Sequence, residues 1–303
     1  MTGFSASGSG PGTGVLDPKV RRWRTKRSGD FRAKLLTLVL LCVGAVLIMV
    51  PFYWMLSTAL KEPGQVYAYP PQWIPDPVRY QNFSDAASLV PIWTFARNSA
   101  IIVTGVMIGT LLSCSLAAYG FARLRAPGRN VIFFILLATL MLPSTVTLVP
   151  TYIGFNRLGW INSFAPLIVP AFFGSPFYIF LLRQFYMTIP RDLEESARLD
   201  GASSFRIWWN IILPLSKPVL ATVAVFTFFA TYNDFFGPLI YLNDRSKQTV
   251  AVALSYFTGS PTVGPQMHLL MAMAALAIVP SLLMFLLAQR YFVQSIVTTG
   301  IKG

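Results

Sequence analysis

The chain has 303 residues, of which 54% are hydrophobic and only 12% are charged. Soluble domains carry roughly twice that charged share, about 25%, so the composition excludes an ordinary soluble fold and indicates a membrane protein. The 24 Lys and Arg outnumber the 11 Asp and Glu, and the net charge is +13. Such an excess is compatible with nucleic acid or acidic lipid as a partner, so the positions of the charges must decide between them.

The N-terminal segment is predicted to be a basic cytoplasmic arm. Gly and Ser are frequent in residues 1–14, and Lys and Arg in residues 19–34. We therefore expect residues 1–30 to be disordered and residues 31–303 to form the membrane domain. The arm either lies on anionic lipid headgroups or only fixes the orientation of the chain. Nucleic acid is not expected, because no recognition module accompanies the charge.

Six long segments with few or no charges follow, each close to the roughly 20 residues that cross a membrane as a helix. The predicted spans are 35–57, 98–122, 131–155, 164–186, 217–241 and 267–289. The first is too long for the core of a cleaved signal peptide. Lys and Arg are concentrated in the N-terminal arm and around 123–129 and 183–217, which the positive-inside rule assigns to the cytoplasm. The sequence therefore predicts an all-α integral membrane protein with six transmembrane helices and both termini inside.

Several residues within the predicted spans favour close packing or helix breaks. Gly105 and Gly109 have the spacing of a helix-packing motif. The third and fourth spans contain Pro143, Pro150, Pro170 and Pro176. These prolines leave backbone carbonyls that either face a cavity or belong to kinked, packed helices.

No motif for catalysis or metal binding accompanies the spans. The sequence contains neither a phosphate-binding G-x-x-x-x-G-K-[ST] loop nor a pair of carboxylates within a span. Cys42 and Cys114 are interpreted as apolar packing residues. His268 has no Cys or acidic residue at ligand spacing. We expect no catalytic residue, no metal and no cofactor in this chain.

The largest cytoplasmic loop, residues 187–216, is predicted to form two short helices. Pro190 followed by acidic residues is typical of a helix start, and Gly201 can adopt the left-handed conformation that ends a helix. Ser203 or Ser204 can cap a second helix that ends at Pro214. The loop is therefore predicted to be an elbow.

This elbow is predicted to have an apolar ridge and an acidic rim. Its apolar positions are Leu193, Ala197, Phe205 and Trp208. Glu194 and Arg198 have the i,i+4 spacing of a helix ion pair. Such an element can dock in a groove on a partner, and the alternative for its acidic residues is a solvated helix face.

One pattern in the loop has fixed spacings over residues 195–214. It consists of Glu195, Ser196, Ala197, Gly201, Ile211, Leu213 and Pro214. It resembles the E-A-A, three residues, G, nine residues, I-x-L-P signature of the permease subunits of binding-protein-dependent ABC importers. All spacings match, and the one difference is Ser196 in place of Ala. The segments 118–123, 232–239 and 289–294 also resemble the carbohydrate branch of that family, the second permease of the maltose and glycerol-phosphate type.

The resemblance implies a fold, a set of partners and a mechanism. The chain would have the type I importer permease fold and lie as a multi-pass protein in the bacterial cytoplasmic (inner) membrane. It would pair with a second homologous permease on a dimer of ATP-binding subunits, which bind ATP and Mg, and an extracytoplasmic sugar-binding protein would deliver the solute. The loop would dock in one ATPase, with Glu195 or Asp200 pairing with a basic residue there, and transmit its closure to the spans.

The candidate substrate path is Tyr232, Asn233 and Asp234. Asp234 lies in the outer part of the fifth predicted span, where a charge favours a polar cavity or a partner over lipid. The resemblance implies pore lining for this segment, and a structural hydrogen-bond role is the alternative.

The sequence therefore predicts a permease subunit for sugar import. An importer of another solute, such as glycerol phosphate or a glycoside, stays open, because the binding protein shares in specificity. A membrane scaffold or channel is the third alternative, for which the loop signature would be unnecessary.

Overall fold

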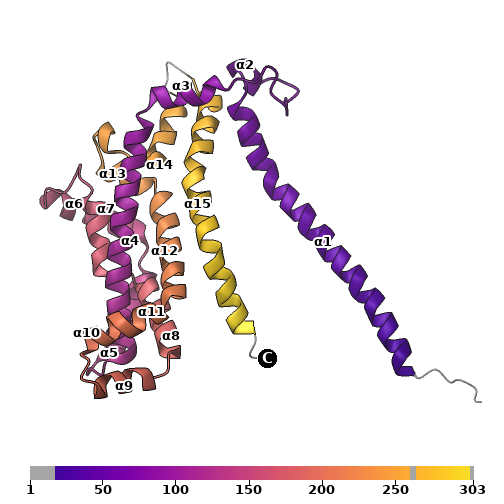
Figure 1. The fold of residues 1–303 in the computed structure, drawn as a ribbon. Coiled ribbons are helices and arrows are strands. Elements are labelled where there is room, and N and C mark those ends of the chain that lie inside the picture. Colours follow the sequence, from indigo (N-terminus) through magenta and orange to yellow (C-terminus); the bar gives the residue numbers. More distant parts are fainter. Residues whose placement is uncertain (1–17, 260–263, 301–303) are drawn as a thin grey trace, which may run out of the picture. The chain divides into compact units, whose positions relative to one another are not determined.

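The computed structural model describes residues 18–259 and 264–300, and all regular structure in these ranges is helical. The predicted all-α class is confirmed (Figure 1). The chain divides into two units, residues 1–54 and residues 55–303.

Most of helix α1, Pro18–Ala59, belongs to the first unit. Its apolar part, Ala33–Ala59, has 27 residues and contains an 18-residue window with a mean hydropathy of 2.8, enough to cross a membrane. This helix corresponds to the predicted span at 35–57. Because α1 begins at Pro18, it includes part of the arm predicted at 1–30. Residues 1–17 lie outside the described residues, so their disorder stays a prediction.

Three helical stretches of the second unit are also long and apolar enough to span a membrane. They are Ile92–Arg123, Ala165–Thr188 and Met267–Gln289. They correspond to the spans predicted at 98–122, 164–186 and 267–289. Two bent helix pairs raise the possible number of spans in the described residues from 4 to 6. The count of six and the orientation stay predictions.

The span predicted at 131–155 is not one straight helix. Helix α5, Arg129–Ala138, continues as the 3-10 turn η1, Thr139–Met141, and α6, Ser144–Arg157, follows. The two halves are bent by 102°. Pro143 lies at the bend, where its ring removes a backbone donor and fixes φ, whereas α6 continues through Pro150.

The span predicted at 217–241 is also interrupted. Helix α12 covers Lys217–Tyr232, and α13, Phe236–Tyr241, follows after a break at residues 233–235. The carboxylate of Asp234 accepts hydrogen bonds from the N–H groups of Phe236 and Gly237, both at 3.1 Å. The carboxylate thereby satisfies backbone N–H donors that are free at the start of α13. A continuous helix would not need this cap, because its own carbonyls would accept from these donors.

Helix α4, Ile92–Arg123, is the central element of the second unit. It packs against α8, Pro176–Thr188, against the 3-10 turn η2, Val169–Phe173, and against α12. Figure 1 shows α9 and α10 near one end of α4 and α3 at the other. Helix α12 also contacts α15, Met267–Gly300.

Small residues on α4 allow the close approach of the fourth span. A Cβ on Gly109 would lie 2.7 Å from the Phe172 ring and 3.2 Å from the Ala171 backbone, and one on Gly105 would meet α7, Ala165–Ile168. The Ser113 hydroxyl donates to the Ala171 carbonyl at 2.9 Å. The predicted packing role of the two glycines is confirmed. The carbonyl of Ala171, in a segment interrupted by prolines, is bonded to α4 in a kinked, packed arrangement.

Replacing Gly109 with Ala is expected to lower the melting temperature of the detergent-purified protein, because the added methyl meets backbone that cannot move aside. Overpacking of this kind costs about 1–3 kcal/mol. Gly120→Ala in the same helix is the matched control, since apart from the neighbouring backbone of α4 no described atom lies within 4 Å of its added Cβ. Equal melting temperatures for the two variants would contradict close packing at Gly109.

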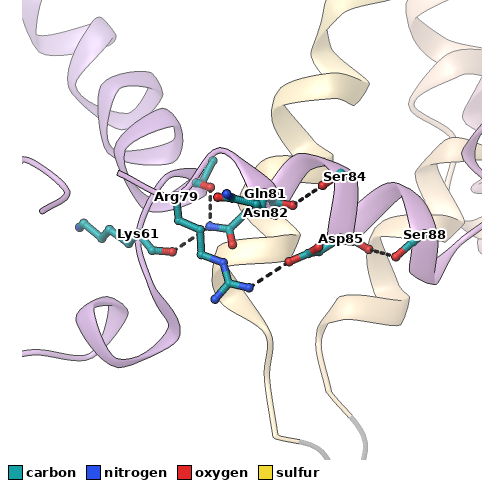
Figure 2. A network of polar contacts seen from close by, with 8 residues as sticks. Lys61, Arg79, Gln81, Asn82, Ser84, Asp85 and Ser88 are labelled. Carbon is teal, nitrogen blue, oxygen red and sulfur yellow. Dashed lines mark hydrogen bonds and ion pairs between the residues drawn. The ribbon is translucent and has the colours of Figure 1, made fainter. Parts of the chain in front are cut away.

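Short helices connect the spans in the second unit. Apart from those in the loop at 187–216, they are α2 (Pro63–Val66), α3 (Gln81–Leu89), η4 (Arg245–Lys247), α14 (Val250–Ala253) and η5 (Leu254–Phe257). Asn82 on α3 is buried and donates to the carbonyls of Ala59 and Lys61, both at 2.8 Å (Figure 2). Burial also lowers the pKa of the Lys61 ammonium. The nearby ion pair of Arg79 and Asp85 is 3.1 Å long and half-exposed, so it contributes only about 0–1 kcal/mol.

Candidate functional site

The loop at 187–216 folds as the predicted elbow. Helix α9 covers Asp192–Leu199, and after a turn α10, Ser204–Ile207, leads into a π-helical turn, η3, Trp208–Ile212, and α11, Leu213–Leu215. Figure 1 shows α9 and α10 together near the α5 end of α4.

The turn between the two helices has the geometry that its sequence predicts. Gly201 has φ +79°. Its N–H donates to the carbonyl of Arg198 at 3.0 Å, and the N–H of Ala202 donates to the carbonyl of Ala197 at 2.9 Å. This pair of bonds is the Schellman motif. Ser203 begins α10 by accepting a hydrogen bond from the Arg206 N–H at 3.3 Å, so the predicted caps are confirmed.

The helical segment that begins with α10 does not end at Pro214, contrary to the prediction. It continues to Leu215, and Ser216 ends it by donating its hydroxyl to the Ile212 carbonyl at 2.6 Å. Pro214 lacks the N–H that an α-helix would direct to the carbonyl four residues earlier. The π-helical turn just before Pro214 already departs from that hydrogen-bond pattern. The chain then bends by 80° into α12.

The inner side of the elbow belongs to the same hydrophobic core as α4 and α8. Ile207, Trp208 and Ile212 are buried with Tyr119 of α4 and Tyr186 of α8. The signature residues Ala197, Ile211 and Leu213 pack against this cluster. These apolar contacts attach α10, η3 and α11 firmly to the spans.

The outer side of the elbow is exposed and mixes apolar with acidic groups. Leu199 is 90% exposed and Phe205 is 62% exposed. Glu195, one turn before Leu199, and Asp200 are also exposed. We call Glu195, Leu199, Asp200 and Phe205 the elbow surface.

The predicted apolar ridge is therefore divided between the two sides. Leu193 and Phe205 are exposed, whereas Trp208 is buried and Ala197 packs inward. Of the remaining signature residues, Ser196 donates its hydroxyl to the Asp192 carbonyl within α9 at 2.9 Å, and Pro214 is exposed.

Glu194 is not part of an exposed acidic rim. Its side chain is only 5% exposed and lies 2.9 Å from the Nε of Arg123, which is 3% exposed. The expected pair with Arg198 exists at the longer distance of 3.8 Å. The sequence pattern missed Arg123 as a partner, and the only signal was its place at the end of the family-like segment 118–123.

The three candidate path residues do not share one role. The Tyr232 hydroxyl donates to the Ala277 carbonyl at 2.8 Å and so joins α12 to α15. Asp234 caps α13. Asn233 is exposed, with its amide donating to the Phe229 carbonyl at 3.0 Å. The structural hydrogen-bond alternative thus has direct support for Asp234.

A pocket of about 280 Å³ lies where α12, α14 and α15 meet. Its lining consists of Tyr232, Asn233, Phe235, Val250, Ala251, Leu254, Ala274, Ala277, Ile278 and Ser281. These residues supply aromatic and small apolar surface with an amide and hydroxyls, and none of these described lining residues is charged.

Asp234→Asn is expected to preserve the stability of the protein, because the amide oxygen can accept the same two backbone hydrogen bonds. Asp234→Ala is expected to lose about 1 kcal/mol, the usual cost of removing a helix cap. Thermal unfolding and solute uptake of both variants would be compared. Unchanged stability in Asp234→Ala would contradict the capping role, and a loss of uptake in Asp234→Asn without loss of stability would assign the charge to the substrate path.

The second unit thus combines apolar helices long enough to span a membrane with an elbow whose inner side is packed against them and whose outer side is exposed. Residues 105–298 match the family described as the binding-protein-dependent transport system inner membrane component, and the chain belongs to this family. It is therefore an inner-membrane permease of the ABC importer class, as the loop signature implied.

Two relatives and one solved structure illustrate the match. The sn-glycerol-3-phosphate transport system permease protein UgpE of Yersinia enterocolitica is 33% identical over 265 residues, which are 86% of this chain and 94% of UgpE. The diacetylchitobiose uptake system permease protein NgcG of Streptomyces coelicolor is 30% identical over 274 residues, 90% of each chain. A chain of a bacterial ABC transporter involved in the import of the acidic polysaccharide alginate has a TM-score of 0.77 at 21% identity, covering 87% of this chain and 98% of that chain. The predicted permease fold is confirmed.

Proposed function

We propose that this chain is one of two homologous permeases in an ATP-driven importer, and that its elbow surface docks in an ATP-binding subunit. The observation that carries this proposal is the division of the elbow. Its inner side is part of the core of the spans, and Leu199 and Phe205 on its outer side are exposed. A stiff element with an exposed apolar surface can dock in a partner and transmit the partner's movement to the spans. In a membrane scaffold that exposed apolar surface would have no function.

The remaining partners follow from this assignment. A dimer of ATP-binding subunits supplies the ATP and Mg chemistry, since the chain carries no phosphate-binding loop motif. Glu195 and Asp200 are exposed and able to pair with basic residues of that subunit. A binding protein on the opposite side of the membrane delivers the solute. In this arrangement closure of the ATPase dimer tilts the spans as a rigid body.

The transported solute in this proposal is a sugar. The pocket beside Asn233 offers aromatic, amide and hydroxyl groups, and none of its described lining residues is charged. That lining suits an uncharged, hydroxyl-rich solute better than a phosphate ester, which calls for cationic groups. Glycerol phosphate is the second candidate, favoured by the 33% identity to a glycerol-3-phosphate permease.

Purification of the tagged chain from its native membrane tests the proposal. We expect an ATP-binding subunit and a second permease to co-purify. In proteoliposomes with the native binding protein, ATP-dependent uptake of labelled diacetylchitobiose or another neutral sugar is expected to exceed uptake of sn-glycerol 3-phosphate. Preferential uptake of the phosphate ester would overturn the sugar assignment, and absence of any co-purifying ATPase would overturn the importer assignment.

A further inference from the structure

The guanidinium of Arg123 connects three helices at the elbow end of α4. Its Nε lies 2.9 Å from a carboxylate oxygen of Glu194 on α9. Its Nη2 donates to the backbone carbonyls of Tyr186, near the end of α8, and Ile189, just after it. The side chains of both ion-pair partners are at least nine-tenths buried. One side chain thus joins the end of α4, the end of α8 and the beginning of α9.

Helix α9 depends on this ion pair more than the rest of the elbow does. The segment 207–212 is held by the buried apolar side chains of Ile207, Trp208 and Ile212. In α9, all of whose residues the structure describes, Glu194 is the only buried residue. Ala197 adds one small apolar contact. The angle of α9, which carries Glu195 and Leu199 of the elbow surface, is therefore set largely by Glu194.

The chemistry of the pair suits a rigid joint. A guanidinium is planar and has five donors in a fixed arrangement, so its hydrogen bonds to two carbonyls and its close ion pair with one carboxylate hold the three helix ends together. The carbonyls lie at the C-terminal end of α8, and the carboxylate lies in the first turn of α9, positions where the helix dipole favours these charges. Removing Glu194 would leave the Arg123 guanidinium buried without a carboxylate, and removing Arg123 would leave Glu194 only its longer contact with Arg198.

We propose that the Arg123–Glu194 ion pair is the positioning link through which movement of α9 reaches α4 and α8. Neither residue touches the solute or ATP. The pair holds α9 at a fixed angle to the spans, so that a displacement imposed on the elbow surface moves the spans instead of bending the loop. This inference depends on the proposed docking of the elbow in an ATPase.

The test replaces each residue of the ion pair with the smallest change that weakens the joint. Glu194→Gln keeps the shape and removes the charge, and Arg123→Lys keeps the charge but replaces the planar guanidinium with a single ammonium that cannot span the same three acceptors. The matched controls are Asp192→Asn on the same helix and Arg125→Lys beyond the end of α4, both at exposed positions. The complete transporter with its native partners is reconstituted for each variant. Diacetylchitobiose and sn-glycerol 3-phosphate are the solute probes.

The deciding quantity is the number of solute molecules imported per ATP hydrolysed, measured at equal amounts of assembled complex. Coupling between sites typically changes a binding or conformational equilibrium 5–150-fold, so we expect this ratio to fall about fivefold or more in Glu194→Gln and Arg123→Lys and to stay unchanged in both controls. A purely structural role predicts less assembled complex with an unchanged ratio, and that result would overturn the inference. An unchanged ratio at unchanged abundance would overturn it as well.

A second measurement separates this inference from the proposed function. Spin labels at Leu199 and at Leu116 of α4, both exposed, report the angle of α9 in the purified chain without any transport assay, after replacement of Cys42 and Cys114. The distance distribution between the labels is expected to broaden in Glu194→Gln and not in Asp192→Asn. If the unmodified transporter imports neither probe, the proposed function fails. Independently of that result, a distance distribution that does not broaden in Glu194→Gln would show that the pair does not position α9.

Discussion

Replacing Gly201 with Asp is expected to lower coupled import by more than about tenfold while the chain still enters the membrane. Gly201 has φ +79°, a conformation that costs a residue with a Cβ about 1–2 kcal/mol. No described atom lies within 4 Å of an added Cβ, so the strain comes from the backbone alone. The larger effect is the new carboxylate, which lies beside Asp200 within the proposed docking surface and would be buried there without a partner of its own.

The measurement is solute uptake together with ATP hydrolysis in the reconstituted transporter, for Gly201→Asp and for Gly201→Asn. Asn has the same shape as Asp, tolerates the left-handed conformation and carries no charge, so it isolates the backbone strain. We expect uptake to fall by more than about tenfold in Gly201→Asp, the effect of about 1.4 kcal/mol or more, and by less in Gly201→Asn. Intact uptake and coupled ATP hydrolysis in Gly201→Asp would show that the docking assignment is wrong.

Phe205→Ala is expected to release the ATP-binding subunit without unfolding the chain, and Trp208→Ala is expected to unfold the elbow. The two rings are neighbours, with centroids 5.2 Å apart, but Phe205 is 62% exposed and Trp208 only 3%. Truncating a central interface aromatic costs about 2 kcal/mol or more of binding. Truncating a buried Trp costs about 3–5 kcal/mol of folding.

Binding of the purified ATP-binding subunit and thermal unfolding of the permease separate these effects. For Phe205→Ala the dissociation constant should rise about thirtyfold, with an unchanged melting temperature. For Trp208→Ala the melting temperature should fall. Unchanged affinity in Phe205→Ala would mean that this ring is not part of the docking surface.

The sequence predicted those features that depend on short segments. Local composition predicted the apolar lengths of four spans and the glycine packing on α4. The Gly201 turn was predictable because few residues adopt its backbone geometry. The elbow was also predictable, because Ser203 and Gly201 act on donors and carbonyls within a few residues. The family signature then indicated what the elbow does.

Other features could not be predicted from the sequence. They depend on contacts between residues that are distant in the chain, or on two structural roles that fit the same sequence pattern. Arg123 and Glu194 are far apart in the chain. The residues around each of them do not distinguish it from an ordinary surface charge. Pro143 signals a break but not a bend of 102°. Asp234 has the same sequence context whether it caps α13 or lines a path, and only the hydrogen bonds to Phe236 and Gly237 distinguish these roles.

Photo-crosslinking from the tip of the elbow tests most directly that the elbow docks in an ATP-binding subunit. A benzophenone amino acid replaces Leu199, which is 90% exposed, in cells that express the native transporter. As a control it replaces Tyr69, which is 94% exposed in the segment between α2 and α3 predicted to lie outside the membrane. We predict that illumination links the ATP-binding subunit to position 199 and not to position 69. Capture of the ATP-binding subunit from position 69, or its absence at position 199, would contradict the account.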